Sequence, residues 1–424
     1  MIVLYNLCQI MVLAFFWPLL LALVPLKAKY RTTLPARLGI GLERHLPTVP
    51  ATGKTVWIHA LSVGEVSSAR PLVIGLRREF PDIRIIFSAT TATGMKTART
   101  LLSDHVDAII PFPLDIRPVI AGYLRQIRPD LFILLETDFW LNILTMLEQA
   151  GIPSILVNGR ISAQSFSRYR RARIVVQRLF RSFTHLCMQT AIDRDNMERL
   201  GVDPGRLHCL GNLKFDALPK TADSGDQHPS VPIPAGTLVL LAGSTHEGEE
   251  DSIFSVYSEL KKRYPALFLI IAPRNPQRCD EISQRAARHD LAVTLRSDNS
   301  STNQADVLLV DSIGELPWLY ARADIAFVGG SMVAAGGHNP IEPAAQGVPV
   351  LFGPHMEDFA EISHDLTLAG GALTVADQAS LAEIVETLIV DENRRQTIGR
   401  QARAFVDRHR GVVERHLQVI RPYL

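Results

Sequence analysis

The feature that most constrains the fold of this 424-residue chain is an alternation of short apolar runs with amphipathic segments. Apolar runs without a polar alternation are typical of parallel strands that helices cover on both faces. The pattern predicts two doubly wound α/β domains that face each other and bind ligands in the cleft at the carboxyl ends of their strands. The expected strands are 56–60, 84–88, 131–135 and 154–158 in the first half and 237–242, 267–272, 307–310, 325–328 and 348–352 in the second.

Residues 219–236 separate the two halves. This stretch is polar and proline-rich and has no periodicity, which is typical of a linker. We therefore predict a first Rossmann-like domain over 28–218, the linker over 219–236 and a second Rossmann-like domain over 237–424.

The N-terminus is the compositional outlier of the chain. Ile2 to Leu26 has no charged residue, although Asn6 and Gln9 interrupt its apolar character. About 20 apolar residues span a bilayer, so the run is long enough to cross a membrane. Four basic residues follow between 27 and 37, which would place the rest of the chain in the cytoplasm. We predict a membrane anchor over 1–27; a cleaved signal peptide is the alternative, but its basic start and its cleavage site are lacking.

The remaining composition narrows the class of partner. Lys and Arg number 44 against 43 Asp and Glu, whereas nucleic-acid binding needs a clear basic excess. The four cysteines have no metal-ligand spacing and indicate a reducing compartment. Asp193-Arg-Asp195 has the spacing of a metal motif, but it opens an expected helix, so we interpret it as a cap and predict no metal site. Residues 168–181 form an arginine-dense amphipathic stretch, either a solvated face or a contact with anionic lipid.

A glycine-rich stretch follows the expected strand at 325–328. Asn339 is a good helix cap and Pro340 a good first helical residue. A helix that begins in such a loop presents free N–H groups to a phosphate, and Glu342 in its first turn could accept sugar hydroxyls. The alternative is an ordinary loop before an ordinary helix.

Three Ser-x-x-Glu sequences follow expected strands, at 62–65, 244–247 and 312–315. Each has the spacing of a helix capping box, which alone would explain it. The position of Glu65 at a strand's carboxyl end, beside Gly64, also suits a general base that acts on a hydroxyl.

Three further charged residues lie where a site would be built. Glu136 ends a buried apolar run, and a carboxylate there is costly unless it is paired or functional, although Glu136 or Asp138 could instead cap the next helix. Arg274 leaves another strand and could hold a phosphate or carboxylate, or lie on the surface. Lys214, near the interdomain edge, has similar potential.

Several ordered motifs together resemble the bacterial 3-deoxy-D-manno-octulosonic acid (Kdo) transferases, which add Kdo to the lipid A precursor. The similarity spans the whole chain, anchor included. The matching segments are His59–Glu65, Leu135–Trp140, Asn158–Ser162, Gly211–Asp216, Ser244–Glu250, Pro273–Arg274, Gly314–Glu315, Phe327–Ser331 and Gly336–Glu342.

The resemblance implies a GT-B glycosyltransferase with an N-terminal membrane anchor helix and a C-terminal helix that crosses back to the first domain. It implies inverting, metal-independent transfer from CMP-Kdo to a phosphorylated glycolipid, on the cytoplasmic side of the bacterial inner membrane. Glu65 matches the family's general base, and Glu136 and Lys214 match residues that support the transition state. The CMP-binding segments match Pro273, Arg274, Ile313, Gly314, Glu315, Asn339, Pro340, Ile341 and Glu342.

The chain departs from the family pattern at two positions. The family usually has proline where this chain has Leu141, and histidine where it has Asn275. Neither removes a proposed catalytic group, but both bear on acceptor and donor contacts. The alternatives to Kdo transfer are a related transferase that uses another CMP-activated ulosonic acid or a different acceptor, and a non-catalytic nucleotide-sugar binder, against which Glu65, Glu136 and Lys214 argue.

Overall fold

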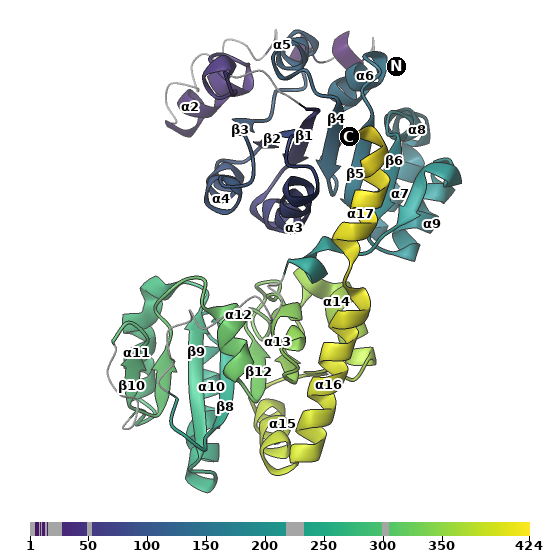
Figure 1. The fold of residues 1–424 in the computed structure, drawn as a ribbon. Coiled ribbons are helices and arrows are strands. Elements are labelled where there is room, and N and C mark those ends of the chain that lie inside the picture. Colours follow the sequence, from purple (N-terminus) through teal and green to yellow (C-terminus); the bar gives the residue numbers. More distant parts are fainter. Residues whose placement is uncertain are drawn as a thin grey trace. The chain divides into compact units, whose positions relative to one another are not determined.

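The computed structural model describes residues 5–7, 9, 11–12, 15, 28–48, 53–217, 233–298 and 305–424. They form two compact units, Met1–Ala217 with Gly411–Leu424 and Leu218–Arg410. Each unit contains one seven-stranded sheet in which every strand pair is parallel (Figure 1). The predicted pair of parallel α/β sheets is therefore confirmed.

The first unit has the strand order β3-β2-β1-β4-β5-β6-β7. Its strands are β1 Thr55–Ala60, β2 Arg84–Ala89, β3 Ala108–Pro111, β4 Leu131–Leu135, β5 Ser154–Gly159, β6 His185–Met188 and β7 Leu207–Cys209. Its helices are α2 Ala28–Arg37, α3 Val63–Glu79, α4 Ala92–Leu102, α5 Arg117–Ile127, α6 Leu141–Gln149, α7 Ala163–Arg171, α8 Arg173–Arg181, α9 Ala191–Arg199 and α17 Val412–Ile420.

The second unit has the order β10-β11-β9-β8-β12-β13-β14. Its strands are β8 Leu238–Thr245, β9 Leu267–Pro273, β10 Val293–Leu295, β11 Val307–Leu309, β12 Ile325–Val328, β13 Val350–Phe352 and β14 Ala372–Thr374. Its helices are α10 Glu250–Arg263, α11 Cys279–Ala287, α12 Leu316–Leu319, α13 Ile341–Ala345, α14 Ala360–Leu368, α15 Gln378–Val390 and α16 Glu392–His409.

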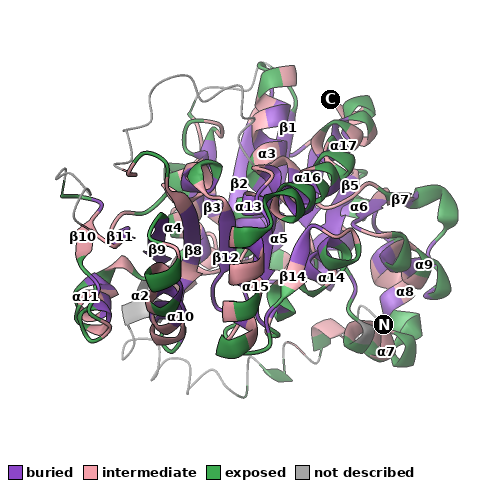
Figure 2. Ribbon diagram, turned by 90° about the horizontal axis from the view of Figure 1, so that it is seen from below, coloured by how far each residue is buried: buried purple, intermediate pink, exposed green. Residues whose placement is uncertain are grey.

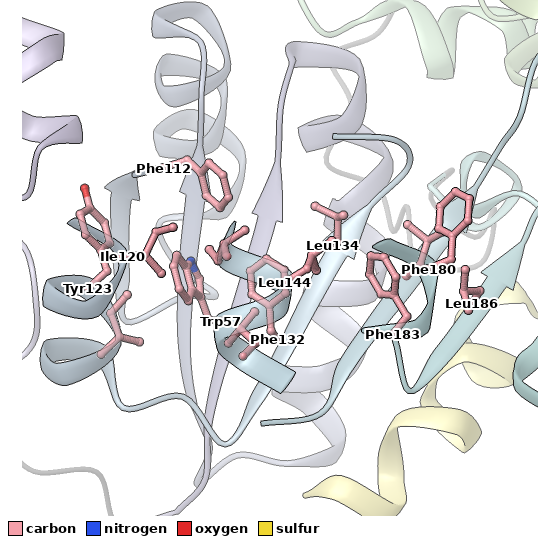
Figure 3. Close-up of a cluster of buried hydrophobic side chains, with 14 of the residues drawn as sticks. Trp57, Phe112, Ile120, Tyr123, Phe132, Leu134, Leu144, Phe180, Phe183 and Leu186 are labelled. Atoms are coloured by element: carbon pink, nitrogen blue, oxygen red, sulfur yellow. The ribbon is translucent and has the colours of Figure 1, made fainter. Parts of the chain in front are cut away.

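The core of the first unit lies on both faces of its sheet, as an all-parallel sheet requires (Figure 2). Successive residues of a strand point to opposite faces, so Trp57 packs on one side and Ile58 on the other. Trp57 stacks on Tyr123 and meets the edge of Phe132, with ring centroids 6.2 and 5.2 Å apart (Figure 3). Its indole N–H is satisfied by Ser88 Oγ at 2.9 Å.

The C-terminal helix α17 completes the core of the first unit. Val412, Leu417 and Ile420 are fully buried in the cluster that lines the α3 side of the sheet. The backbone of α3 comes close to α17 at Gly75, where a Cβ atom would lie 2.7 Å from Val413 Cγ1. Asp216 caps α17 by accepting the N–H groups of Gly411 and Val413 at 2.9 and 2.7 Å.

Two sequence predictions fall largely on residues that lie outside the described part of the chain. Most of the anchor predicted over 1–27 is among them, as are residues 219–232 of the predicted linker. In the part that is described, no helix has both the length and the apolar character needed to cross a bilayer.

Candidate functional site

Glu65 lies in the first turn of α3, directly after β1 ends. Ser62 caps the helix by accepting the Glu65 N–H, and the Glu65 carboxylate turns back to accept the Leu61 N–H at 2.6 Å. The capping interpretation of this sequence is therefore correct for Ser62. It is wrong for the other two sequences: α10 begins only at Glu250, and α12 has Glu315 itself as its cap residue.

The environment of Glu65 alters its acidity. Burial raises the pKa of this carboxyl to about 8, against the opposing effect of the Leu61 N–H. The negative charges of Glu136 and Asp138 raise it further. A carboxyl with a perturbed pKa at the carboxyl end of a parallel strand is a candidate for proton transfer.

His59 and Asp138 form a buried pair beside Glu65. His59 lies on β1 with no exposed surface, and its Nε2 is 3.0 Å from Asp138 Oδ2. Burial lowers the pKa of His59, which favours the neutral imidazole. Burial alone would raise the pKa of Asp138, but the contact with His59 and the charge of Arg37 bring it below its usual value. The alternative that Glu136 or Asp138 caps the next helix is wrong, because Asp115 accepts the N–H groups of Asn142 and Ile143.

Glu136 lies at the carboxyl end of β4 in a conformation that few side chains adopt. Its φ is +56°, and Asn158 on the neighbouring β5 has φ +57°. Left-handed backbone at non-glycine residues costs energy and is concentrated at functional sites. Asn158 donates from Nδ2 to Glu136 Oε1 at 3.2 Å. Burial raises the pKa of Glu136, while the charge of Lys214, the Asn158 amide and the charge of Arg160 oppose that rise.

Lys214 lies in a short 3-10 helix, η3 (Leu213–Asp216), that follows β7. The side-chain amide of Asn158, which contacts Glu136 through Nδ2, also holds this turn, because its Oδ1 accepts the Leu213 N–H at 3.0 Å. Asn212 caps the turn by accepting the Lys214 N–H, also at 3.0 Å. The structure thus brings Glu65, Glu136 and Lys214 together at one edge of the first sheet. Asn158 fixes two of them, a role its sequence motif gave no reason to expect.

In the second unit, Glu249 organises the glycine-rich loop that follows β12. This fully buried carboxylate accepts four backbone N–H groups, those of His246 and Gly330 at 2.9 and 2.7 Å and those of Ser331 and Met332 at 3.0 and 2.9 Å. The role of Glu249 was not predicted from the sequence, in which only Glu247, two residues earlier, stood out as the end of a Ser-x-x-Glu capping pattern.

The predicted nucleotide-binding residues gather at the same carboxyl edge of the second sheet. Pro273 ends β9, and the exposed Arg274 follows it. Burial raises the pKa of Glu342, opposed by the amide of Asn339 at 3.1 Å and by the charge of Arg274. The Asn339 side chain accepts the Ile341 N–H at 3.1 Å, so the predicted cap exists. However, α13 begins at Ile341, one residue later than predicted, and ends at Ala345, so its dipole is small.

Glu315 is held in place by an ion pair. Arg296 Nε donates to Glu315 Oε2 at 3.0 Å, and the Ser312 hydroxyl contacts the other carboxylate oxygen. Between these residues, Gly314 adopts φ +96° and the side chain of Ile313 is 89% exposed.

Two histidines also meet at this edge. His246 Nε2 and His338 Nε2 are 2.8 Å apart, and both rings lie against Gly330. Burial, followed by the charges of Arg274 and His246, lowers the pKa of His338 to about 4. Within the described residues, no three His, Cys, Asp or Glu side chains are grouped as metal ligands would be.

The two departures from the family pattern have local explanations. Leu141 is the first residue of α6, a position that suits proline and leucine alike. Asn275 caps the turn Pro276–Arg278 by accepting the Gln277 N–H at 3.2 Å.

The arginine-dense stretch forms two helices, α7 and α8, rather than one, and leaves Ile174 82% exposed. Asp193 is buried and accepts the Ile161 N–H, so the role of its carboxylate is structural.

The fold, with two parallel Rossmann-like sheets, is GT-B-like. The chain superposes on a UDP-GlcNAc 2-epimerase from Neisseria meningitidis with a TM-score of 0.58 at 15% identity, over 82% of this chain and 94% of that one. It superposes on a glycosyltransferase from Rickettsia africae with a TM-score of 0.55 at 12% identity, over 88% of this chain and 99% of that one.

Sequence comparison identifies the family. Residues 32–217 match the family model described as 3-deoxy-D-manno-octulosonic-acid transferase (kdotransferase). The chain is 33% identical to the 3-deoxy-D-manno-octulosonic acid transferase of Haemophilus influenzae, over 98% of this chain and 96% of that protein. The chain belongs to the Kdo transferase family of glycosyltransferases, as its motifs predicted.

Proposed function

We propose that this protein transfers Kdo from CMP-Kdo to a phosphorylated lipid A precursor, with inversion at the anomeric carbon and without a metal ion. The observation that carries the proposal is the full-length similarity to a named Kdo transferase, together with Glu65 at the carboxyl end of β1. The reaction would take place at the cytoplasmic face of the bacterial inner membrane, to which residues 1–27 would anchor the chain.

In this mechanism an acceptor hydroxyl attacks the anomeric carbon of Kdo from the side opposite the phosphate. The new C–O bond forms as the bond to the phosphate oxygen breaks, Glu65 takes the hydroxyl proton and CMP leaves with its electron pair. Glu136 and Lys214 would stabilise the charges that develop, since both lie at the same sheet edge as Glu65.

The second unit would hold the donor. Arg274 offers a cation for the phosphate, and the Glu342 carboxyl offers an acceptor for ribose hydroxyls. Pro273, Ile313, Gly314 and Glu315 would frame the base, and the turn Asn339–Ile341 would close over the phosphate. The neutral His338 is available as a hydrogen-bond donor there without adding charge.

The test is transfer by purified protein from CMP-Kdo to a lipid A precursor, read by mass spectrometry, which also counts the Kdo units. We expect the wild type to transfer Kdo and Glu65→Gln to lose activity by about 10²–10⁴-fold. Glu198→Gln, an exposed glutamate of α9, is the matched control and should keep wild-type activity. A chelator should not change the rate.

Three outcomes would contradict the proposal. Absence of Kdo transfer by the wild type would overturn the activity, and transfer only from a different CMP-activated ulosonic acid would favour the related transferase. Full activity in Glu65→Gln would leave Ser62 and Glu65 with a capping role alone.

A further inference from the structure

The N-terminal apolar run makes specific polar contacts with the first unit. Tyr5 Oη donates to Asp115 Oδ2 at 3.0 Å, and Gln9 Nε2 donates to the Asp115 backbone carbonyl at 2.9 Å. Asn142 Nδ2 donates to Asn6 Oδ1 at 2.8 Å. We call these five residues the polar seam.

The receiving side of the seam is built into the domain. Asp115 and Asn142 have exposed fractions of only 6% and 0%. Asp115 caps α6 by accepting two of its N–H groups, and the Asn142 amide also donates to the Asp115 carbonyl at 2.8 Å. The two residues follow β3 and β4, so they lie at the carboxyl edge of the sheet that also bears Glu65 and Glu136.

The other side of the same segment is apolar and exposed. Leu7, Met11, Val12 and Phe15 have exposed fractions of 52%, 55%, 56% and 79%. Their spacing of four, one and three residues places them on one face of a helix, and the described residues of this run are helical. A helix with polar groups toward the protein and apolar groups outward is the reverse of a water-exposed helix and is the arrangement found in lipid.

We propose that the polar seam holds the N-terminal helix against the carboxyl edge of the first sheet, the edge that bears Glu65 and Glu136. We propose also that the face formed by Leu7, Met11, Val12 and Phe15 lies in the bilayer. The seam explains why Asn6 and Gln9 interrupt an otherwise apolar run. The helix would hold the carboxyl edge of β1 and β4 at the membrane surface, where an acylated acceptor can reach Glu65 without leaving the lipid. This last step rests on the proposed function; the seam itself does not.

Cross-linking tests the seam. The full chain, in membranes and with Cys8→Ser and Cys209→Ser, would carry Asn6→Cys with Asn142→Cys and be treated with a mild oxidant. We expect the 6–142 disulfide, identified by peptide mass spectrometry, in most molecules. The matched control joins Leu7→Cys to Asn142→Cys and should stay at background, because Leu7 faces away. Equal yields for the two pairs would overturn the seam.

Lipid contact is tested with a fluorescent label on Met11→Cys in the same cysteine background, in vesicles that contain brominated phospholipid. Bromine should quench this label but not one on Val390→Cys, an exposed position of α15. A label at Met11 that bromine does not quench would overturn the placement of the apolar face in lipid.

The functional consequence is tested with Gln9→Leu, which keeps the run apolar and leaves the domain's own side chains intact. The variant loses two hydrogen bonds, the one from Gln9 Nε2 to the Asp115 carbonyl and one from Asn142 Nδ2 to Gln9 Oε1 at 3.4 Å. Their loss predicts a roughly tenfold fall in transfer to the acylated acceptor in vesicles. Transfer to the deacylated, water-soluble acceptor should not change. An equal loss on both acceptors, or none on either, would overturn the role of the helix in acceptor access. If the wild type transferred Kdo to neither acceptor, the proposed function would fail while the cross-link still reported on the seam.

Discussion

The Glu249 carboxylate allows a direct test of how the glycine-rich loop that follows β12 is held in place. Its two oxygens accept four backbone N–H groups, and the donors from Gly330 and Ser331 are fully buried. A buried N–H without a partner costs about 1–3 kcal/mol, so Glu249→Ala should destabilise the second unit by about 2–6 kcal/mol. At about 2–4 °C per kcal/mol for a domain of this size, the melting temperature should fall by roughly 10 °C.

Glu249→Gln keeps the size of the side chain but removes its negative charge and replaces one of its two acceptor oxygens with a donor group. The glutamine amide can still accept from Ser331 and Met332, but its NH2 group would face the N–H groups of His246 and Gly330. We expect about half the destabilisation of the alanine variant and a raised KM for CMP-Kdo, because the loop beside the donor site loosens.

The assays are thermal unfolding and steady-state transfer, with Glu247→Gln as control. Glu247 lies in the same turn, but its side chain is 74% exposed and forms an ion pair with Arg285 at 3.4 Å, so its loss should cost less than about 0.5 kcal/mol. Wild-type unfolding temperature and KM in Glu249→Gln would refute the argument that four amides depend on this carboxylate.

Four further predictions concern residues of the site. Because the pKa of Glu65 is raised to about 8, kcat/KM should rise with pH up to about 8. The raised pKa should also make the free energy of unfolding fall as pH rises from about 4.5 through 8, and Glu65→Gln should make this fall smaller in urea unfolding curves. Asn158→Gly keeps the left-handed backbone but removes the amide that holds Glu136 and Leu213, so it should lower kcat at least about tenfold and cost about 1–3 kcal/mol in unfolding; wild-type kcat would contradict this. Glu342→Ala should raise KM for CMP-Kdo with little change in kcat, whereas Glu383→Ala on the exposed side of α15 should change neither.

The sequence was informative where a residue's own neighbours decide its structure. Buried strands such as 131–135 were recognisable because parallel strands are apolar on both faces. The short strands β3, β6, β7, β10 and β14 were not predicted, because three or four residues give little periodicity. The family motifs led to Glu65, Glu136 and Lys214, and the fold places all three at one sheet edge.

What could not be predicted depends on contacts between distant residues. Glu249 and Gly330 are 81 positions apart, and Asn158 and Leu213 are 55 apart. Nothing local distinguishes Glu249 from Glu247 before the loop from β12 is brought against it. The residue that caps α6 could not be predicted for the same reason, because Asp115 lies 27 positions before Asn142 in the sequence.

The placement of α17 has a consequence for synthesis. Val412, Leu417 and Ile420 belong to the core of the first unit, but they follow the whole of the second unit in the sequence. The first unit therefore cannot complete its core until the second unit has been synthesised, although most of the first unit emerges before the second. A nonsense codon just after residue 410 would leave the second unit whole and strip the first of three buried side chains, about 4–9 kcal/mol of apolar burial. A segment that is synthesised after the second unit thus controls the folding of the unit that is synthesised before it.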